Sequence, residues 1–257
     1  MSVNIKKLYN DPLYIRNIEN PTEDEQIEAV KRNGMVIKFI NNPSNVVKRE
    51  AILNNPLCIE YIEDLPEELA ILAVQLLWNS IKYVKNLTNN IMREAVKSKG
   101  WAIQFIENPP EEIKLLAVEK DFDAIKYIKN PSEEVQIRAI ETYWGAIRFI
   151  DNPTLEARRC AIKIDEESIN YIMNYDFDDL KIFIGDNINI VKYVYDSIDI
   201  DTILEIIKEK ICKDDIDYKY MRDFLELEVL EMDKIDFVKN YGSKNAKMTL
   251  IDYKLGL

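Results

Sequence analysis

The chain has 257 residues, of which 34 are Lys or Arg and 46 are Asp or Glu, so its formal net charge is −12. It contains no histidine, which excludes hydrolases with a histidine base and zinc sites with a histidine ligand. The 6 glycines are never clustered, so no glycine-rich phosphate-binding loop is present. We therefore expect no catalytic residues, no metal site and no cofactor.

Hydrophobic residues make up 47% of the chain, but no apolar run approaches the roughly 18 residues of a membrane span. Residues 1–12 lack the apolar stretch of a secretion signal. Cys58, Cys160 and Cys212 form no C-x-x-C pair, which indicates reduced, buried thiols. We expect a soluble, cytoplasmic protein.

A 22-residue repeat dominates the sequence. We number each repeat from the residue after an Asn-Pro-type junction. Position 9 is then Ala in seven of eight repeats, position 10 is Val or Ile in all eight, and positions 17 and 20 are always Ile or Val. The repeats span residues 21–196 and begin at Pro21, Pro43, Leu65, Leu87, Pro109, Pro131, Pro153 and Tyr175.

Residues 1–20 precede this array. They contain Ile15 and Ile18, at positions 17 and 20 of a repeat whose first helix is missing. Because the ends of a solenoid must shield its core from water, this segment predicts an N-terminal half-repeat cap.

Each repeat predicts two helices. Position 2 is Thr or Ser in five repeats and acidic residues often follow it, so a helix begins there with a side-chain cap. Apolar positions 5, 9 and 10 lie on one face of this helix, and glycine or proline then marks a turn in four repeats. A second, shorter helix carries a small residue at position 16 and the apolar pair at positions 17 and 20. Asn or Asp closes it at position 22.

Helix pairs this short cannot bury their apolar faces alone, so neighbouring repeats must stack into one core. The predicted fold is all-α: a right-handed α-solenoid of about eight two-helix repeats with terminal caps. A leucine-rich repeat is the alternative fold with a similar period. It would need an L-x-L strand beside the asparagine, whereas this chain has I-x-x-I spacing there. The segments IKYIKNPSEEVQIRAI and IQFIENPPEEIKLLAV resemble short helical repeats of bacterial and phage proteins, a family of unknown function similar to leucine-rich-variant and HEAT-like solenoids. The resemblance covers about residues 15–195 and implies an architecture but no catalytic residue.

After Asn174 the pattern weakens, since Phe183 replaces the alanine of position 9 and no proline follows Pro153. Residues 197–257 predict longer helices at about 200–212 and 218–232, with an uncertain tail from Lys247. They form either a C-terminal helical cap or a small domain with its own role.

Two adjacent positions of the second helix are candidates for partner binding. Position 19 is aromatic in all eight repeats, and position 18, which should point outward, is basic in five. The simplest interpretation is that the position 19 rings form a half-buried edge of the core and that the position 18 charges are solvated. The alternative is a cationic and aromatic stripe that holds an acidic peptide or a single nucleic-acid strand. The candidate residues are Lys38, Lys82, Lys126, Arg148, Lys192, Tyr61, Tyr83, Tyr127 and Tyr171.

The three tryptophans lie near the turn between the two helices, where they fill the gap between neighbouring repeats or anchor an interface. Position 4 is acidic in six repeats. Acidic residues in the first turn stabilise a helix, which explains most of this pattern. The alternative is that these acids form a ridge for a basic partner.

The absence of a catalytic pattern and the acidic balance predict a non-catalytic scaffold that binds another protein with a basic surface. The bias towards Ile, Asn and Lys indicates an AT-rich bacterial or phage source. A specific version is therefore an inhibitor or immunity-type protein against a basic, nucleic-acid-handling target. The alternative function is nucleic-acid binding along the Lys and aromatic stripe.

Overall fold

The computed structural model describes residues 3–256. The chain divides into two compact modules, Met1–Pro131 and Ser132–Leu257, and the division falls inside the repeat array. Within residues 3–256 there is no strand, and none of the helices is long and apolar enough to cross a membrane. The predicted all-α repeat architecture is confirmed.

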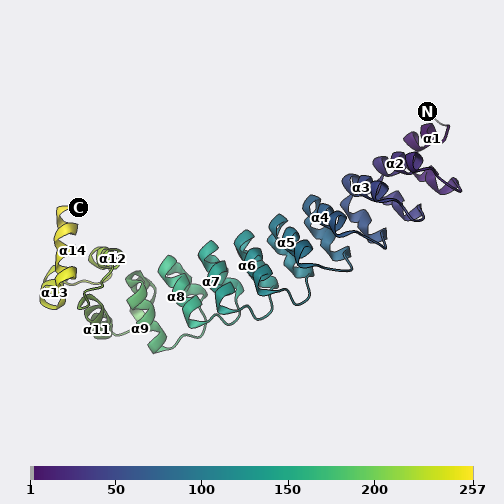
Figure 1. The fold of residues 1–257 in the computed structure, drawn as a ribbon. Helices are drawn as coiled ribbons and strands as arrows, with labels where there is room; N and C mark the ends of the chain where they lie inside the picture. Colours follow the sequence, from purple (N-terminus) through teal and green to yellow (C-terminus); the bar gives the residue numbers. More distant parts are fainter. Residues whose placement is uncertain (1–2, 257) are drawn as a thin grey trace. The chain divides into compact units, whose positions relative to one another are not determined.

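In the N-terminal module the α helices stack in chain order, each against the one before it (Figure 1). A six-residue 3-10 helix, labelled η, follows each of them. The bounds are α1 Val3–Asn10, η1 Pro12–Asn17, α2 Glu23–Arg32, η2 Gly34–Phe39, α3 Asn45–Asn54, η3 Pro56–Tyr61, α4 Glu67–Leu76, η4 Trp78–Tyr83, α5 Asn89–Ser98, η5 Gly100–Phe105, α6 Glu111–Lys120 and η6 Phe122–Tyr127.

The C-terminal module continues the repeat and then departs from it. Its elements are α7 Glu133–Thr142, η7 Trp144–Phe149, α8 Leu155–Ile164, η8 Glu166–Tyr171, α9 Phe177–Asp186, η9 Ile188–Ile190, α10 Val191–Val194, η10 Tyr195–Ser197, α11 Ile200–Ile211, α12 Tyr218–Glu226, α13 Lys234–Tyr241 and α14 Lys244–Leu255. The helix predicted to reach residue 232 ends at Glu226, and the uncertain tail is helical. Since α11 contacts α9 and α12 contacts η9, these helices pack against the last repeat.

The N-terminal segment holds a helix pair rather than half of one. Helix α1 occupies positions 5–12 of a repeat and packs against α2. The expectation of a missing first helix is wrong, because Leu8 stands at position 10 and is fully buried there.

The structure confirms the predicted start of the first helix in each repeat. The α helices of the eight repeats run from position 3 to position 12. In five of them the position 2 hydroxyl accepts a hydrogen bond from the position 5 amide, as the N-caps Thr22, Ser44, Thr88, Ser132 and Thr154 show. At position 22, four asparagines have φ between 48° and 59°, a left-handed conformation that asparagine tolerates better than most residues: Asn42, Asn108, Asn130 and Asn174.

The second element of the first seven repeats is a 3-10 helix, where the sequence predicted only a shorter helix. One extended residue at position 13 joins the two helices, as Asn33 does with φ −151° and ψ 102°. Because a 3-10 helix has three residues per turn, positions 17 and 20 share one face and positions 16 and 19 share the next. The position 19 ring therefore lies on the same face as the buried small residue of position 16. Position 18 lies on the third face and points to solvent.

The three thiols differ in burial. Cys58 lies in the core, and burial raises the pKa of its thiol to about 12. Cys160 is half-buried and Cys212 is exposed. The expectation of buried thiols is thus confirmed for Cys58 and wrong for Cys212, because Cys212 caps the end of α11, outside the repeat stack.

Gly100 marks a close approach between two repeats. A methyl group added to Gly100 would lie well inside 3.0 Å of the Ala117 carbonyl oxygen. We expect Gly100→Ala to lower the free energy of unfolding by about 1–3 kcal/mol, because the repeats must move apart. Urea unfolding followed by circular dichroism measures the change.

The control is Gly185→Ala in α9, where nothing lies within 4 Å of the added methyl group. Since alanine favours a helix over glycine, this variant should gain about 0.5–1 kcal/mol. Equal midpoints for the two variants would contradict the close packing at Gly100.

Candidate functional site

The side chains at positions 18 and 19 of the short helices form what we call the cation–aromatic row. All eight position 18 side chains are exposed, as the sequence predicted. The position 19 rings expose 36–43% of their surface in five repeats and are more buried in the others, so they form a half-buried edge of the core. In the N-terminal module the candidate residues of this row are Lys38, Lys82, Lys126, Tyr61, Tyr83 and Tyr127.

The lysines of the row lie over its rings. Lys38 Nζ lies 5.2 Å from the ring centre of Phe39 and 5.4 Å from that of Tyr61. Lys82 Nζ lies 4.7 Å from the ring centre of Tyr83. Such cation–π contacts contribute about 0.5–1 kcal/mol each at exposed sites. The Phe39, Tyr61 and Tyr83 rings therefore each have a cation of the protein beside them.

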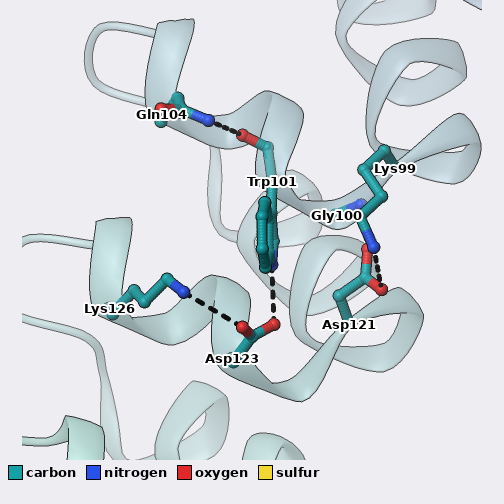
Figure 2. A network of polar contacts seen from close by, with 7 residues as sticks. All are labelled: Lys99, Gly100, Trp101, Gln104, Asp121, Asp123 and Lys126. Carbon is teal, nitrogen blue, oxygen red and sulfur yellow. Dashed lines mark hydrogen bonds and ion pairs between the residues drawn. The ribbon is translucent and has the colours of Figure 1, made fainter.

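A polar network surrounds Trp101 in this module (Figure 2). Trp101 Nε1 donates to Asp123 Oδ1 at 2.6 Å, and Lys126 Nζ lies 3.0 Å from Asp123 Oδ2. Burial alone would raise the pKa of Asp123, but the hydrogen bonds from Trp101 and Lys126 lower it. The hydrogen bond to Asp123 in turn raises the pKa of Lys126. Both groups of this pair stay charged at neutral pH.

A second carboxylate binds the start of η5. Asp121 Oδ2 accepts a hydrogen bond from the Gly100 amide at 2.6 Å, and Asp121 Oδ1 lies 2.8 Å from Lys99 Nζ (Figure 2). Since Asp121 and Asp123 belong to the next repeat, the two carboxylates tie adjacent repeats together. Lys126 is thus partly held by the scaffold, whereas Lys38 and Lys82 have no ion pair within the described residues.

The tryptophans contact the position 19 ring of the following repeat. The ring centres lie 6.0 Å apart for Trp78 and Phe105, and 6.1 Å apart for Trp101 and Tyr127. In the C-terminal module Trp144 and Tyr171 are also 6.1 Å apart. The tryptophans are only partly exposed, so they fill the gap between neighbouring repeats.

Each tyrosine of the row in the N-terminal module lines a cavity. The cavities have volumes of about 480, 380 and 530 Å³ and contain Tyr61, Tyr83 and Tyr127 respectively. Their walls come from the Asn-Pro-type junction of one repeat and the 3-10 helix of the next. In the first cavity, Lys48 Nζ donates to the Asp64 carbonyl oxygen at 2.8 Å. The sequence did not predict these junction walls, and its only signal for them was the regular 22-residue spacing of the junctions.

In the C-terminal module the candidate residues at positions 18 and 19 are Arg148, Tyr171 and Lys192. The Arg148 guanidinium lies 5.0 Å from the Tyr171 ring centre, and its Nε donates to the Gly145 carbonyl oxygen at 2.9 Å. Lys192 Nζ lies 3.6 Å from the Glu166 carboxylate, which neutralises that charge. The structure therefore brings Arg148 and Tyr171 together and pairs Lys192 with an acid.

The acidic residues of position 4 are exposed in all six repeats that have them: Asp24, Glu68, Glu112, Glu134, Glu156 and Asp178. Half of them form ion pairs, with Arg93, Arg159 and Lys181. No cluster of three or more metal-ligating side chains occurs in the described part of the chain.

Comparison with protein-family models, with curated proteins and with solved structures finds no match to this chain. The arrangement of its own side chains is therefore the basis of any functional proposal.

Proposed function

We propose that the chain is a non-catalytic scaffold that binds another protein, and that the part of the cation–aromatic row in the N-terminal module receives an extended, acidic segment of that partner. The observation that carries the proposal is the repetition of an exposed position 18 beside a half-buried ring on each short helix. Packed helices lie about 8–10 Å apart, and an extended peptide advances about 3.3 Å per residue. Every third residue of such a peptide would meet a ring and the cavity beside it.

The charges of the row favour an acidic segment. Lys38 and Lys82 are exposed, carry no ion pair within residues 3–256 and stand beside Tyr61 and Tyr83. A partner carboxylate can reach these ammonium groups without displacing an acid of the protein. A basic partner, which the net charge of −12 favours, would instead meet the acids of position 4.

Single-stranded nucleic acid is the second candidate, because rings interleaved with cations are the usual platform for stacked bases. Lys38 over Tyr61 and Arg148 over Tyr171 weigh against it, since a base can stack on these faces only after the cation moves away. A role as a bacterial or phage inhibitor or immunity-type protein in the cytoplasm stays a prediction.

A charge-reversal variant tests the row. We expect the triple variant Lys38→Glu, Lys82→Glu, Lys126→Glu to bind a fluorescent Glu-rich peptide about 10- to 100-fold more weakly than the parent, by anisotropy at low salt. The matched control reverses three exposed lysines of α helices in the same module, with the same change in net charge: Lys31→Glu, Lys97→Glu and Lys120→Glu.

The probe separates the candidates. An oligo-dT that binds more tightly than the Glu-rich peptide, with a steep salt dependence, would support nucleic-acid binding instead. A Lys-rich peptide that binds better than both would support the basic partner. Equal losses in the triple variant and its control would remove the row as the binding surface.

A further inference from the structure

A cavity of about 420 Å³ lies in the C-terminal module, where the last repeats meet the C-terminal helices. This volume is within the range of small-ligand sites, about 300–1,000 Å³. The wall combines residues of four α helices that are distant in sequence. The side chains that matter are Arg159 and Lys163 from α8, Asp186 from α9, Lys210 from α11, and Lys219 and Tyr220 from α12.

The wall is positive although the protein is acidic. Four cations line it against three carboxylates, and one of these, Asp186, is engaged by two of the cations. Asp186 accepts two hydrogen bonds from Arg159, at 2.7 and 3.0 Å, and lies 3.6 Å from Lys163 Nζ. Lys210 and Lys219 have no ion pair within the described part of the chain. Two ammonium groups are therefore free to bind an anion at this wall.

Tyr220 supplies a third donor. Its side chain is only 4% exposed, and its hydroxyl group has no hydrogen-bond partner within residues 3–256. Leaving a buried hydroxyl unpaired is unfavourable, so such a group in a native protein calls for a partner. Burial, and then the charge of Asp186, raise the pKa of Tyr220, so the hydroxyl keeps its proton. Lys210 Nζ lies 5.4 Å from the ring centre and places an unpaired cation beside this unpaired donor.

We propose that this cavity binds a small phosphate-bearing ligand, with the Tyr220 hydroxyl and the Lys210 and Lys219 ammonium groups as its donors. A phosphate group offers three strong acceptor oxygens, which matches three donors that come from two helices. A carboxylate offers two. A metal cation would be repelled by the four positive side chains of the wall.

Isothermal titration with inorganic phosphate, in a buffer free of other phosphates, tests the site on the full chain. We expect the parent protein to bind phosphate and Tyr220→Phe to bind it about tenfold more weakly, since one hydrogen bond to a charged ligand is lost. Lys210→Gln should weaken binding by at least as much. Lys254→Gln, an exposed lysine in α14, is the matched control and should bind as the parent does.

The Tyr220→Phe variant keeps the ring and removes no hydrogen bond of the unliganded protein, so we expect it to fold normally by circular dichroism. Phosphate held by lysines elsewhere on the surface would bind equally to the parent and to Tyr220→Phe, and that result would overturn the proposal. No binding to the parent at millimolar phosphate would overturn it as well. Succinate that binds as tightly as phosphate would show a general anion site and refute the phosphate assignment. Tighter binding of adenosine monophosphate than of inorganic phosphate would identify a nucleotide as the source of the phosphate group.

Discussion

Phe183→Ala is expected to lower the free energy of unfolding of the C-terminal module by about 3–5 kcal/mol. Phe183 stands in α9 at position 9, where the other seven repeats have alanine. Its side chain is completely buried, its ring meets the Tyr175 ring edge-on at 6.1 Å, and the Arg158 guanidinium lies 5.8 Å from its centre. Alanine would leave a cavity there, although the repeat pattern alone suggests that it restores the common residue.

Urea unfolding followed by circular dichroism gives the comparison. The control is Ile182→Ala in the same helix, a side chain that is already 37% exposed and should cost much less. A Phe183→Ala variant as stable as the parent would show that α9 closes onto its neighbours as the other repeats do.

Ile125→Ala is expected to destabilise the N-terminal module by about 2–5 kcal/mol. Ile125 is 1% exposed at position 17 of η6, which packs against α6 and η5. Because each repeat contacts only its neighbours, the lost contacts cannot be replaced from elsewhere in the array. The effect should appear in the urea midpoint and in the thermal midpoint.

Leu76→Ala is the matched control for Ile125→Ala, since Leu76 is 49% exposed at the end of α4 in the same module. Alanine is also a good helix former, so we expect little change. If both variants lost equal stability, the stacked apolar positions would not be the main source of stability in this module.

The sequence predicted the repeats well because each carries its own local signals. The hydroxyl at position 2 and the apolar residues at positions 9 and 10 act within one helix turn or one repeat, so their spacing alone reveals the α helix. The second helix was predicted without its type. Two apolar residues that are three positions apart lie on one face in both an α helix and a 3-10 helix. Only the backbone conformation distinguishes the two helix types.

The sequence predicted where the residues of the cation–aromatic row lie, but not which contacts they make. The exposure of Lys38 and Lys126 follows from the local helix geometry. The sequence did not show that Trp101 of one repeat donates to Asp123 of the next, because that contact forms only when the repeats stack. Nor did it show that Lys126 pairs with Asp123 three residues before it while Lys38 carries no ion pair within the described residues. The cavities beside the row were missed for the same reason.

By itself, the sequence determined that this protein is an all-α repeat array with capped helices and an Ala-lined core, because 22-residue periodicity is a local property of the chain. Only the tertiary structure decided where the array departs from its pattern. Leu8 completes a helix pair at one end, and Phe183 is completely buried near the other in place of the usual alanine. The proposed anion cavity has no sequence signature, since Lys210 and Tyr220 come to line the same cavity as Asp186 only through the packing of α11 and α12 against the last repeat.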